Sequence, residues 1–244
     1  MFNAEINSDV LTEFIDYVSV VDEEIKLDLT GGFKTRCVDP ANVLMTEIHV
    51  DSESFDSFES EGVTLGVDIS KFDDIASFSS SDDMVEFDYN ERVQKLNLNT
   101  GGLEYTLSLI SLDAIREQPN IPNLNLSAEI VINSDNLNNA VSAADMVGSQ
   151  VTLGTTSDDE FYVESSGDTD DVERVFSSDE LISIDSDGSY ESLYSLKYLN
   201  DVSDVIPSDT NVTIRIGNDF PIFIEVDLKY SDGEVIFVLA PRIG

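Results

Sequence analysis

Few residues of this chain have the types and spacing that catalysis or metal binding requires. The sequence contains one histidine, His49, and one cysteine, Cys37. A single cysteine excludes an intrachain disulfide and a cysteine-built zinc site, and a single histidine leaves a Ser-His-Asp triad or a multi-histidine metal centre without redundancy. We therefore interpret His49 as a strand side chain and Cys37 as a buried, inert thiol.

Carboxylates are abundant, but their spacing carries little information. With 50 Asp and Glu in 244 residues, pairs at any separation arise by chance, so we assign no hydrolytic pair. The segment Asp185-Ser186-Asp187-Gly188 resembles part of a calcium loop. A full EF-hand loop needs an aspartate at position 183 and a glutamate at position 194, where the chain has Ser183 and Tyr194. The sequence predicts no enzyme, no metal site and no cofactor, and allows loose cation binding by acidic loops.

Glycine pairs mark turns rather than phosphate-binding loops. The pairs at 31–32 and 101–102 lie between predicted strands, and no helix follows either pair to bind a phosphate. The segment 167–171, which reads Gly-Asp-Thr-Asp-Asp, is also predicted to be a turn.

The charge of the chain is strongly negative and evenly spread. Twelve Lys and Arg oppose 50 Asp and Glu, which gives a formal net charge of −38, yet 41% of the residues are hydrophobic. Such a chain can bury a core. The negative charges on its surface repel one another until salt screens them, and at 1 M salt the screening length is only about 3 Å. We favour adaptation to a very salty cytoplasm over the alternative, an acidic protein that binds basic partners. With no secretion signal and no apolar run of about 20 residues, we expect a cytoplasmic protein that binds no membrane.

An internal repeat organises the chain. Ile6-Asn7-Ser8-Asp9 recurs 126 residues later as Ile132-Asn133-Ser134-Asp135, and apolar residues at helical spacing follow both copies. Ser8 and Ser134 are placed as helix N-caps. Alternating apolar residues then predict strands, and second helices are predicted at 70–78 and 194–205, each followed by more strands.

The repeat predicts an α+β protein of two similar domains. A segment at 112–126, with Pro119 and Pro122 among asparagines, disfavours helix and central strand and is predicted to be an extended connector. The predicted domains are residues 1–113 and 127–244, joined by residues 114–126.

Several motifs resemble the sliding DNA clamps of the proliferating-cell-nuclear-antigen type, in their archaeal, halophilic form. The residues that carry this resemblance span almost the whole chain. They are Met1-Phe2-x-Ala4, Val38-Asp39-Pro40-Ala41-Asn42-Val43, Leu65-Gly66-Val67-Asp68, Tyr198-Leu199, Asp219-Phe220-Pro221-Ile222 and the terminal Leu239-Ala240-Pro241-Arg242-Ile243.

The resemblance implies the DNA-clamp fold in a closed homotrimer, with helices lining the ring interior and antiparallel sheets outside. Head-to-tail contacts of this kind close into a ring when the rotation allows. The family's subunit contact pairs two edge strands, which hides edges that would otherwise associate without control. The matching segments here are 105–109 and 172–176, with Tyr105, Leu107, Leu109, Val172, Val175 and Phe176 as interface residues.

The helices depart from the family pattern, because the residues expected to face DNA are mostly acidic or neutral. Lys71 and Lys197 are the expected DNA-facing lysines, six around a trimer. The other outward positions are Thr12, Glu13 and Asp16, then Asp73, Asp74 and Ser77, then Asn138, Asn139, Ser142 and Asp145, then Asn200, Asp201 and Asp204. Affinity from counterion release falls steeply with salt. We therefore expect the ring to hold duplex DNA by topology; the alternative is that this ring does not hold DNA.

The resemblance also implies a docking surface for short partner peptides with apolar anchors. Its lining would be Val38, Val43, Met45, Ile121, Pro122, Tyr198, Pro221, Ala240 and Pro241. Val38, Val43 and Met45 could equally be ordinary core residues.

The predicted function is a non-enzymatic processivity factor for DNA polymerase in the cytoplasm, at the nucleoid. Its expected partners are double-stranded DNA, the polymerase, a clamp loader, a flap nuclease and a ligase. Alternatives are a repair clamp or one subunit of a heterotrimer, an acidic surface or adhesion protein, and an acid-dependent hydrolase.

Overall fold

The computed structural model describes residues 1–81, 83–117, 120–121, 124 and 126–242 of the chain. These residues form two compact units. Unit 1 comprises Met1–Pro40, Met45–Pro119 and Leu228–Val235, and unit 2 comprises Ala41–Leu44, Asn120–Asp227 and Ile236–Gly244. Each unit thus takes a short segment from a distant part of the sequence. The predicted boundaries at residues 113 and 127 stay a prediction.

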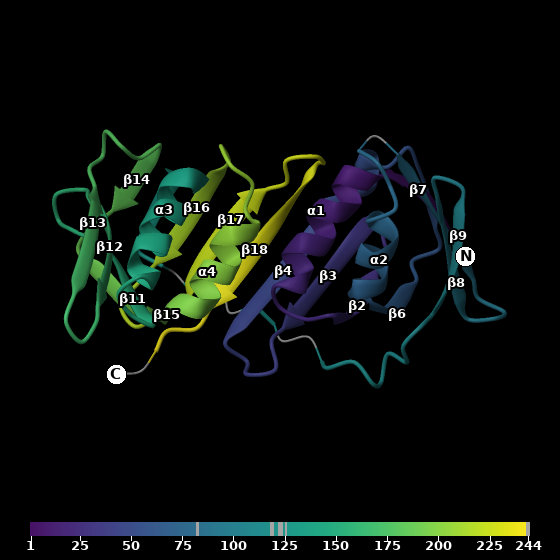
Figure 1. Ribbon diagram of the computed structural model, residues 1–244, viewed down its shortest axis with the longest axis horizontal. Helices are drawn as coiled ribbons and strands as arrows, with labels where there is room; N and C mark the ends of the chain where they lie inside the picture. The colour runs from purple at the N-terminus through teal and green to yellow at the C-terminus, as the bar shows by residue number, and fades with distance from the viewer. Residues whose placement is uncertain (82, 118–119, 122–123, 125, 243–244) are drawn as a thin grey trace. The chain divides into compact units, whose positions relative to one another are not determined.

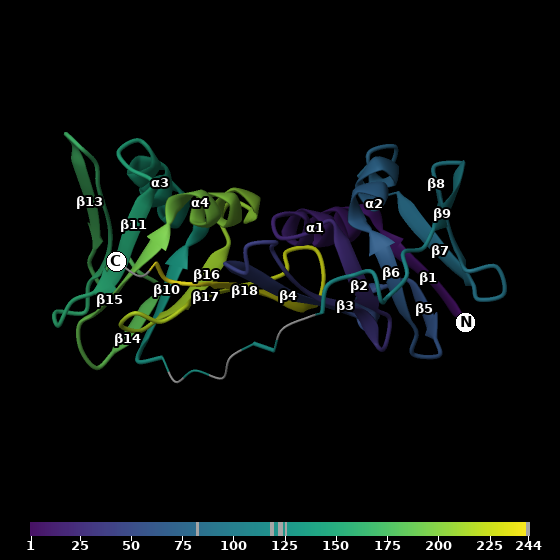
Figure 2. The same cartoon turned by 90° about the horizontal axis from the view of Figure 1, so that it is seen from below.

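Unit 1 places two helices against antiparallel strands (Figure 1). Its elements are β1 (Phe2–Asn7), α1 (Ser8–Ser19), β2 (Glu24–Asp28), β3 (Gly32–Val38), β4 (Leu44–Asp51), β5 (Ser57–Ser60), β6 (Thr64–Asp68), α2 (Ile69–Ala76), β7 (Met84–Asn90), β8 (Lys95–Thr100) and β9 (Leu103–Ser108). The strands lie in the orders β5-β1-β7-β8-β9 and β4-β3-β2-β6. Figure 2 shows α1 and α2 together on one face of these strands, and the two helices contact each other.

Unit 2 repeats this arrangement. Its elements are β10 (Ala128–Asn133), α3 (Ser134–Asp145), β11 (Gln150–Thr155), β12 (Phe161–Ser166), β13 (Asp171–Phe176), β14 (Ser183–Ser186), β15 (Tyr190–Ser195), α4 (Leu196–Val205), β16 (Asn211–Ile216), β17 (Ile222–Asp227) and β18 (Gly233–Leu239). The strand orders are β14-β10-β16-β17-β18 and β13-β12-β11-β15, which match those of unit 1 strand for strand. Residues 233–235 of β18 belong to unit 1 and the rest of that strand to unit 2. The predicted α+β fold with an internal repeat is confirmed.

The helix starts correct one prediction, because the N-caps are the asparagines and not the serines. Asn7 accepts a hydrogen bond from the Asp9 amide at 2.8 Å, and Asn133 accepts one from the Asp135 amide at 3.0 Å. Ser8 is already helical, and its buried hydroxyl donates to the Ser80 carbonyl at 2.8 Å. A hydroxyl that has a carbonyl acceptor from a distant segment does not need to cap its own helix.

The two cores differ in composition. In unit 1 the Phe33 ring lies 4.9–6.3 Å, centroid to centroid, from the rings of Phe2, Phe14, Phe55 and Phe87. In unit 2 the rings of Phe161 and Phe176 are stacked, with centroids 6.0 Å apart, and the other buried apolar side chains are mainly Val, Ile, Leu and Ala. Tilted and edge-on ring contacts add to the stabilisation from area burial.

The segment predicted as an extended connector contains no helix or strand in its described residues. Pro119 and Pro122 lie outside the described residues. Within unit 1, the Arg116 guanidinium donates to the Asp39 carbonyl at 3.0 Å. This contact fastens the start of the connector to the end of β3.

Candidate functional site

The exposed side of α1 is acidic, but one of its predicted outward residues is buried. Thr12 and Asp16 are exposed, whereas Glu13 is only 6% exposed, so the outward prediction for Glu13 was wrong. The Glu13 carboxylate accepts hydrogen bonds from the amides of Lys229 and Tyr230 at 2.7 and 3.1 Å. These amides belong to the Leu228–Val235 segment of unit 1, and burial raises the Glu13 pKa.

Asp16 lies close to a second carboxylate. Partial burial and, secondly, the charge of Asp73 on α2 raise the pKa of Asp16. Like charges on neighbouring helices oppose the ionised form of each other. The exposed surface shared by α1 and α2 is therefore unfavourable for phosphates at low salt.

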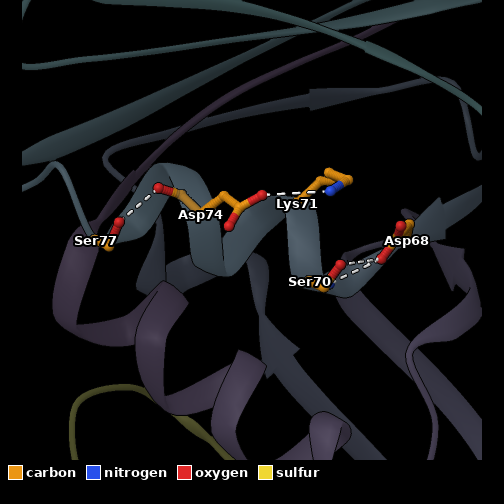
Figure 3. Close-up of polar contacts among 5 residues, drawn as sticks. All are labelled: Asp68, Ser70, Lys71, Asp74 and Ser77. Carbon is orange, nitrogen blue, oxygen red and sulfur yellow. Dashed lines mark hydrogen bonds and ion pairs between the residues drawn. The ribbon is translucent and has the colours of Figure 1, made fainter.

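The one basic side chain on α2 is held by an acid of the same helix (Figure 3). Lys71 Nζ lies 3.4 Å from Asp74 Oδ2, and this contact raises the Lys71 pKa. Asp68 caps the helix by accepting from the Ser70 amide at 3.1 Å and from the Ser70 hydroxyl at 2.6 Å, and Ser77 donates to the Asp74 carbonyl at 2.7 Å. The carboxylates around Lys71 offset its charge, so it offers a phosphate little net attraction.

Unit 2 shows the same neutralisation. Lys197 Nζ on α4 lies 2.6 Å from Asp201 Oδ2, one helical turn away. Of the residues predicted to face outward on α3, Asn139, Ser142 and Asp145 are exposed, whereas Asn138 is half-buried and accepts a hydrogen bond from the Ser142 hydroxyl at 3.0 Å. The four helices thus present amides, hydroxyls, two lysines paired with aspartates, and further carboxylates such as Asp16 and Asp73. Asp74 lies three residues after Lys71, and Asp201 lies four residues after Lys197. Side chains at these spacings are neighbours on a helix, so both ion pairs were predictable from the sequence.

Both predicted contact segments lie on edge strands in the structure. β9 ends the sheet β5-β1-β7-β8-β9, and β13 ends the order β13-β12-β11-β15. Tyr105 is 36% exposed on β9, while Leu109 just after β9 and Val172 and Val175 on β13 are half-buried. Leu107 and Phe176 are 5% and 1% exposed, so each packs inside its own unit.

Six residues of the predicted peptide-binding lining belong to unit 2: Val43, Ile121, Tyr198, Pro221, Ala240 and Pro241. All six are half-buried. The Ala240 amide donates to the Val43 carbonyl at 2.9 Å, and the Arg242 amide donates to the Leu193 carbonyl at 2.7 Å. These two bonds fix Ala240 and Pro241 between residue 43 and the end of β15.

Two further anchors position this surface. The Tyr194 hydroxyl donates to the Phe220 carbonyl at 2.9 Å, which holds the residue before Pro221 against β15. Lys197 Nζ lies 5.3 Å from the centroid of the Tyr198 ring. Val43, Tyr198 and the 220–221 step are therefore attached to the rigid part of unit 2.

The remaining residues of the predicted peptide-binding lining do not belong to unit 2 or are not described. Val38 and Met45 belong to unit 1, pair across the β3–β4 hairpin, and are 8% and 7% exposed. Pro122 lies outside the described residues. The role of Val38 and Met45 as pocket lining stays a prediction.

Cys37 and His49 lie on strands. Cys37 is buried in β3, and burial raises its thiol pKa. His49 is a β4 side chain with Nε2 at 3.4 Å from Asp51 Oδ1. Among the residues that the structure describes, no group of three or more His, Cys, Asp and Glu side chains is arranged to hold a metal ion. Within the same residues, no helix is long and apolar enough to cross a membrane.

The predicted turns are confirmed. The Gly167 amide donates to the Asp170 carbonyl at 2.9 Å between β12 and β13. The pairs at 31–32 and 101–102 all have positive φ, from 56° to 138°, between consecutive strands. Asp187, Gly188 and Ser189 form the short connection from β14 to β15.

Comparison with known proteins gives full-length matches. No protein-family model matches the chain. Curated proteins named "DNA polymerase sliding clamp" are similar to it: 42% identical in Natronomonas pharaonis and 41% in Haloarcula marismortui, both halophilic archaea, and 39% in Methanocella arvoryzae. Each match covers 100% of this chain and 99% of the relative.

Solved structures of PCNA proteins are also similar to this chain over its full length. "C-terminal region of FEN-1 bound to A. fulgidus PCNA" matches with a TM-score of 0.92 and 30% identity, over 100% of this chain and 99% of that one. PCNA from Thermococcus kodakaraensis has a TM-score of 0.91 at 21% identity, over 99% of this chain and 100% of that one, which supports the fold.

Proposed function

Because this chain belongs to the DNA polymerase sliding clamp family, we propose that three copies of it close head to tail into a ring around duplex DNA. It is a processivity factor and not an enzyme. The ring tethers a polymerase to its template, which replaces repeated association by a high effective concentration.

The observation that carries the ring is that β9 of unit 1 and β13 of unit 2, each six residues long, both lie at the edge of a sheet. Pairing β9 of one copy with β13 of the next satisfies both edges with main-chain hydrogen bonds. A head-to-tail contact between two different surfaces generates a closed ring when its rotation permits. Unsatisfied edges would otherwise promote uncontrolled association.

The ring retains DNA by topology. Lys71 and Lys197 both have a carboxylate partner on their own helix, and phosphate binding through counterion release weakens steeply as salt rises. A duplex inside a closed ring leaves only when the ring opens or when a DNA end passes through. A clamp loader opens the ring.

Partner proteins dock through short peptides on the surface that Val43, Tyr198, Pro221, Ala240 and Pro241 provide. The A. fulgidus relative was solved with the C-terminal region of FEN-1. The corresponding peptide of a flap nuclease is the first ligand to test, and peptides of the polymerase and the ligase follow. The clamp works in the cytoplasm, at the nucleoid.

Mass in solution tests the ring. In molar KCl, light scattering should give three times the chain mass for the native protein. Tyr105→Asp places a charge on the exposed part of β9 and should give monomers. Phe78→Asp, at a 71% exposed position after α2, is the matched control and should stay trimeric. A monomeric native protein, or a trimeric Tyr105→Asp variant, would contradict the pairing.

Circular DNA tests encirclement. Loaded clamps should stay on a circular duplex in molar KCl. Once the circle is cut, they should slide off the free ends and be lost from the DNA. Equal retention before and after cutting would show that binding, and not topology, holds the protein.

A charge at the docking surface tests the peptide site. Pro241→Glu should weaken the flap-nuclease peptide at least about tenfold, since it buries a charge against apolar anchors. Pro207→Glu, at another half-buried proline of unit 2, should leave the affinity unchanged. Both variants should remain trimeric, and unchanged peptide affinity in Pro241→Glu would refute the assignment.

A further inference from the structure

Unit 2 contains a hollow of about 510 Å³ that the function above does not use. Its walls come from β11, β12 and β15, which are neighbours in one sheet, and from the turn after β16. Tyr162 and Tyr190 supply two aromatic rings, and Glu191 and Asp219 supply two carboxylates. Among the described residues that line the hollow, none is basic.

A glycine creates the space for the first ring. Gly154 on β11 lies opposite Tyr162 on one side and opposite Glu191 on the other. A Cβ atom at Gly154 would lie 2.4 Å from the Tyr162 ring, so only glycine lets this ring lie across the strand. The Tyr162 hydroxyl reaches over Gly154 and donates to Glu191 Oε2 at 3.0 Å.

The second ring is fixed from both ends. The Tyr190 hydroxyl donates to Asp187, and the Tyr190 amide donates to the buried Thr155 hydroxyl at 3.3 Å. The amide of Glu191 donates to Asn218 Oδ1 at 2.9 Å, which joins the turn after β16 to β15. Both tyrosines are therefore held in place before any ligand arrives.

The repeat shows that the fold alone does not produce this hollow. The cross-strand row Glu191, Gly154, Tyr162 in unit 2 corresponds to the row Thr64, Asp28, Lys34 in unit 1. There an aspartate side chain fills the position of the glycine, and a lysine replaces the tyrosine.

The chemistry of the lining selects a flat cation. Burial first, then the hydrogen bond to Glu191, raise the pKa of Tyr162 to about 12, so the ring stays neutral at any physiological pH. A neutral ring face attracts cations, and carboxylates bind a guanidinium with two parallel hydrogen bonds. A guanidinium stacks on aromatic rings and is less strongly hydrated than an ammonium. In molar salt, where screening acts over about 3 Å, such short contacts persist while long-range attraction does not.

We propose that this hollow binds the guanidinium group of an arginine side chain presented by a partner polypeptide. The rim residue Asp219 stands two positions before Pro221, so a chain docked on Pro221 can place an arginine in the hollow. This link to docking rests on the proposed function, but the binding of the arginine does not.

The test uses the native protein with ring-labelled tyrosines in molar KCl. Arginine amide should shift the NMR signals of Tyr162 and Tyr190 in a saturable way, lysine amide should do so more weakly, and glutamine amide should not. Glu191→Gln should weaken arginine amide roughly tenfold, the loss of one charge-assisted contact. Glu129→Gln, at an exposed glutamate of β10, is the matched control and should change nothing. No saturable shift, equal shifts from glutamine amide, or an unaffected Glu191→Gln variant would overturn the proposal.

A second comparison identifies the source of the arginine. The tetrapeptide amide Gly-Arg-Gly-Gly should bind at least as well as free arginine, whose own carboxylate is repelled by Glu191 and Asp219. Tighter binding of free arginine would assign the hollow to a small molecule and overturn the polypeptide source. Because these probes need neither a ring nor a docked peptide, failure here is distinguishable from failure of the proposed function.

Discussion

The two units are built alike where their first helices begin and differently one turn later. At α1 and at α3 an asparagine caps the helix, and a buried serine donates to a carbonyl of a distant loop at 2.8 Å in both copies. Five residues further on, Glu13 is buried and binds two amides, whereas Asn139, at the matching position, is exposed.

The difference teaches which features of the repeat are fixed. Helix ends carry backbone groups that must find partners in any copy, so the residues that satisfy them recur. A helix face depends on what covers it. The Leu228–Val235 segment belongs to unit 1 and supplies the amides that Glu13 binds, so the same helical position carries a buried acid in one unit and a solvated amide in the other.

Removal of the Glu13 carboxylate should have the largest effect. Glu13→Ala leaves the amides of Lys229 and Tyr230 without their acceptor and should lower the free energy of unfolding by about 2 kcal/mol. Asn139→Ala should change it by less than about 0.5 kcal/mol. Denaturant unfolding in molar KCl measures both, and equal losses would show that the two faces are equivalent after all.

The buried serines should give losses no larger than that of Glu13→Ala, and the loss should be smaller in unit 1 than in unit 2. Ser8→Ala removes one hydrogen bond, to the Ser80 carbonyl, and should cost about 1 kcal/mol. Ser134→Ala should cost about 2 kcal/mol, because the Ser134 hydroxyl also accepts from the Thr210 amide at 3.1 Å. The same unfolding experiment ranks them, and a larger loss in Ser8→Ala would contradict this order.

Asp16 should act in the opposite direction. A raised carboxyl pKa means that the folded state disfavours the charge. The stability that depends on Asp16 therefore falls as pH rises from its ordinary pKa through the raised value. Above that window, Asp16→Asn should raise the melting temperature, and by more at low salt than in molar KCl, because salt screens the repulsion from Asp73 but leaves the effect of partial burial.

The control for Asp16 comes from the other unit. Ser142 holds the matching position on α3 and is already uncharged, so Ser142→Asn should leave the melting temperature unchanged at both salt concentrations. A stabilisation by Asp16→Asn that is equally large at low salt and in molar KCl would rule out charge repulsion as a contribution to it.

The helix lysines should have the smallest effect. Lys71→Ala and Lys197→Ala should each change the lifetime of the loaded clamp on circular DNA by less than about twofold in molar KCl, because each lysine is already paired with an aspartate. Lifetime is measured after dilution into DNA-free buffer. A large loss for either variant would show that lysine contacts hold the DNA.

The sequence predicted the parts of the fold that depend on local patterns. Apolar spacing and the 126-residue repeat predicted the helices and their order, because both follow from periodicity along the chain. The choice between Asn7 and Ser8 as cap was not predictable, since both residues are good caps and the acceptor of Ser8 is 72 residues away.

The candidate sites likewise include features that local sequence patterns predict and features that they do not. The acidic partners of Lys71 and Lys197 lie at helical spacing and could have been predicted. The burial of Glu13 depends on a segment more than 200 residues away, and the Tyr162 hollow depends on the strand register that sets Gly154 between Tyr162 and Glu191. Neither relation is visible before the strands and segments are assembled.

The burial of the only thiol has a practical consequence for anyone who wishes to watch the molecule work. Cys37 is buried and its sulfur stays protonated, so the folded chain should resist maleimide dyes without any mutation. A cysteine introduced at Met146, which is 87% exposed, would then be the single reactive thiol on each copy. One fluorophore per chain, counted by stepwise bleaching, would report directly how many chains surround each DNA molecule.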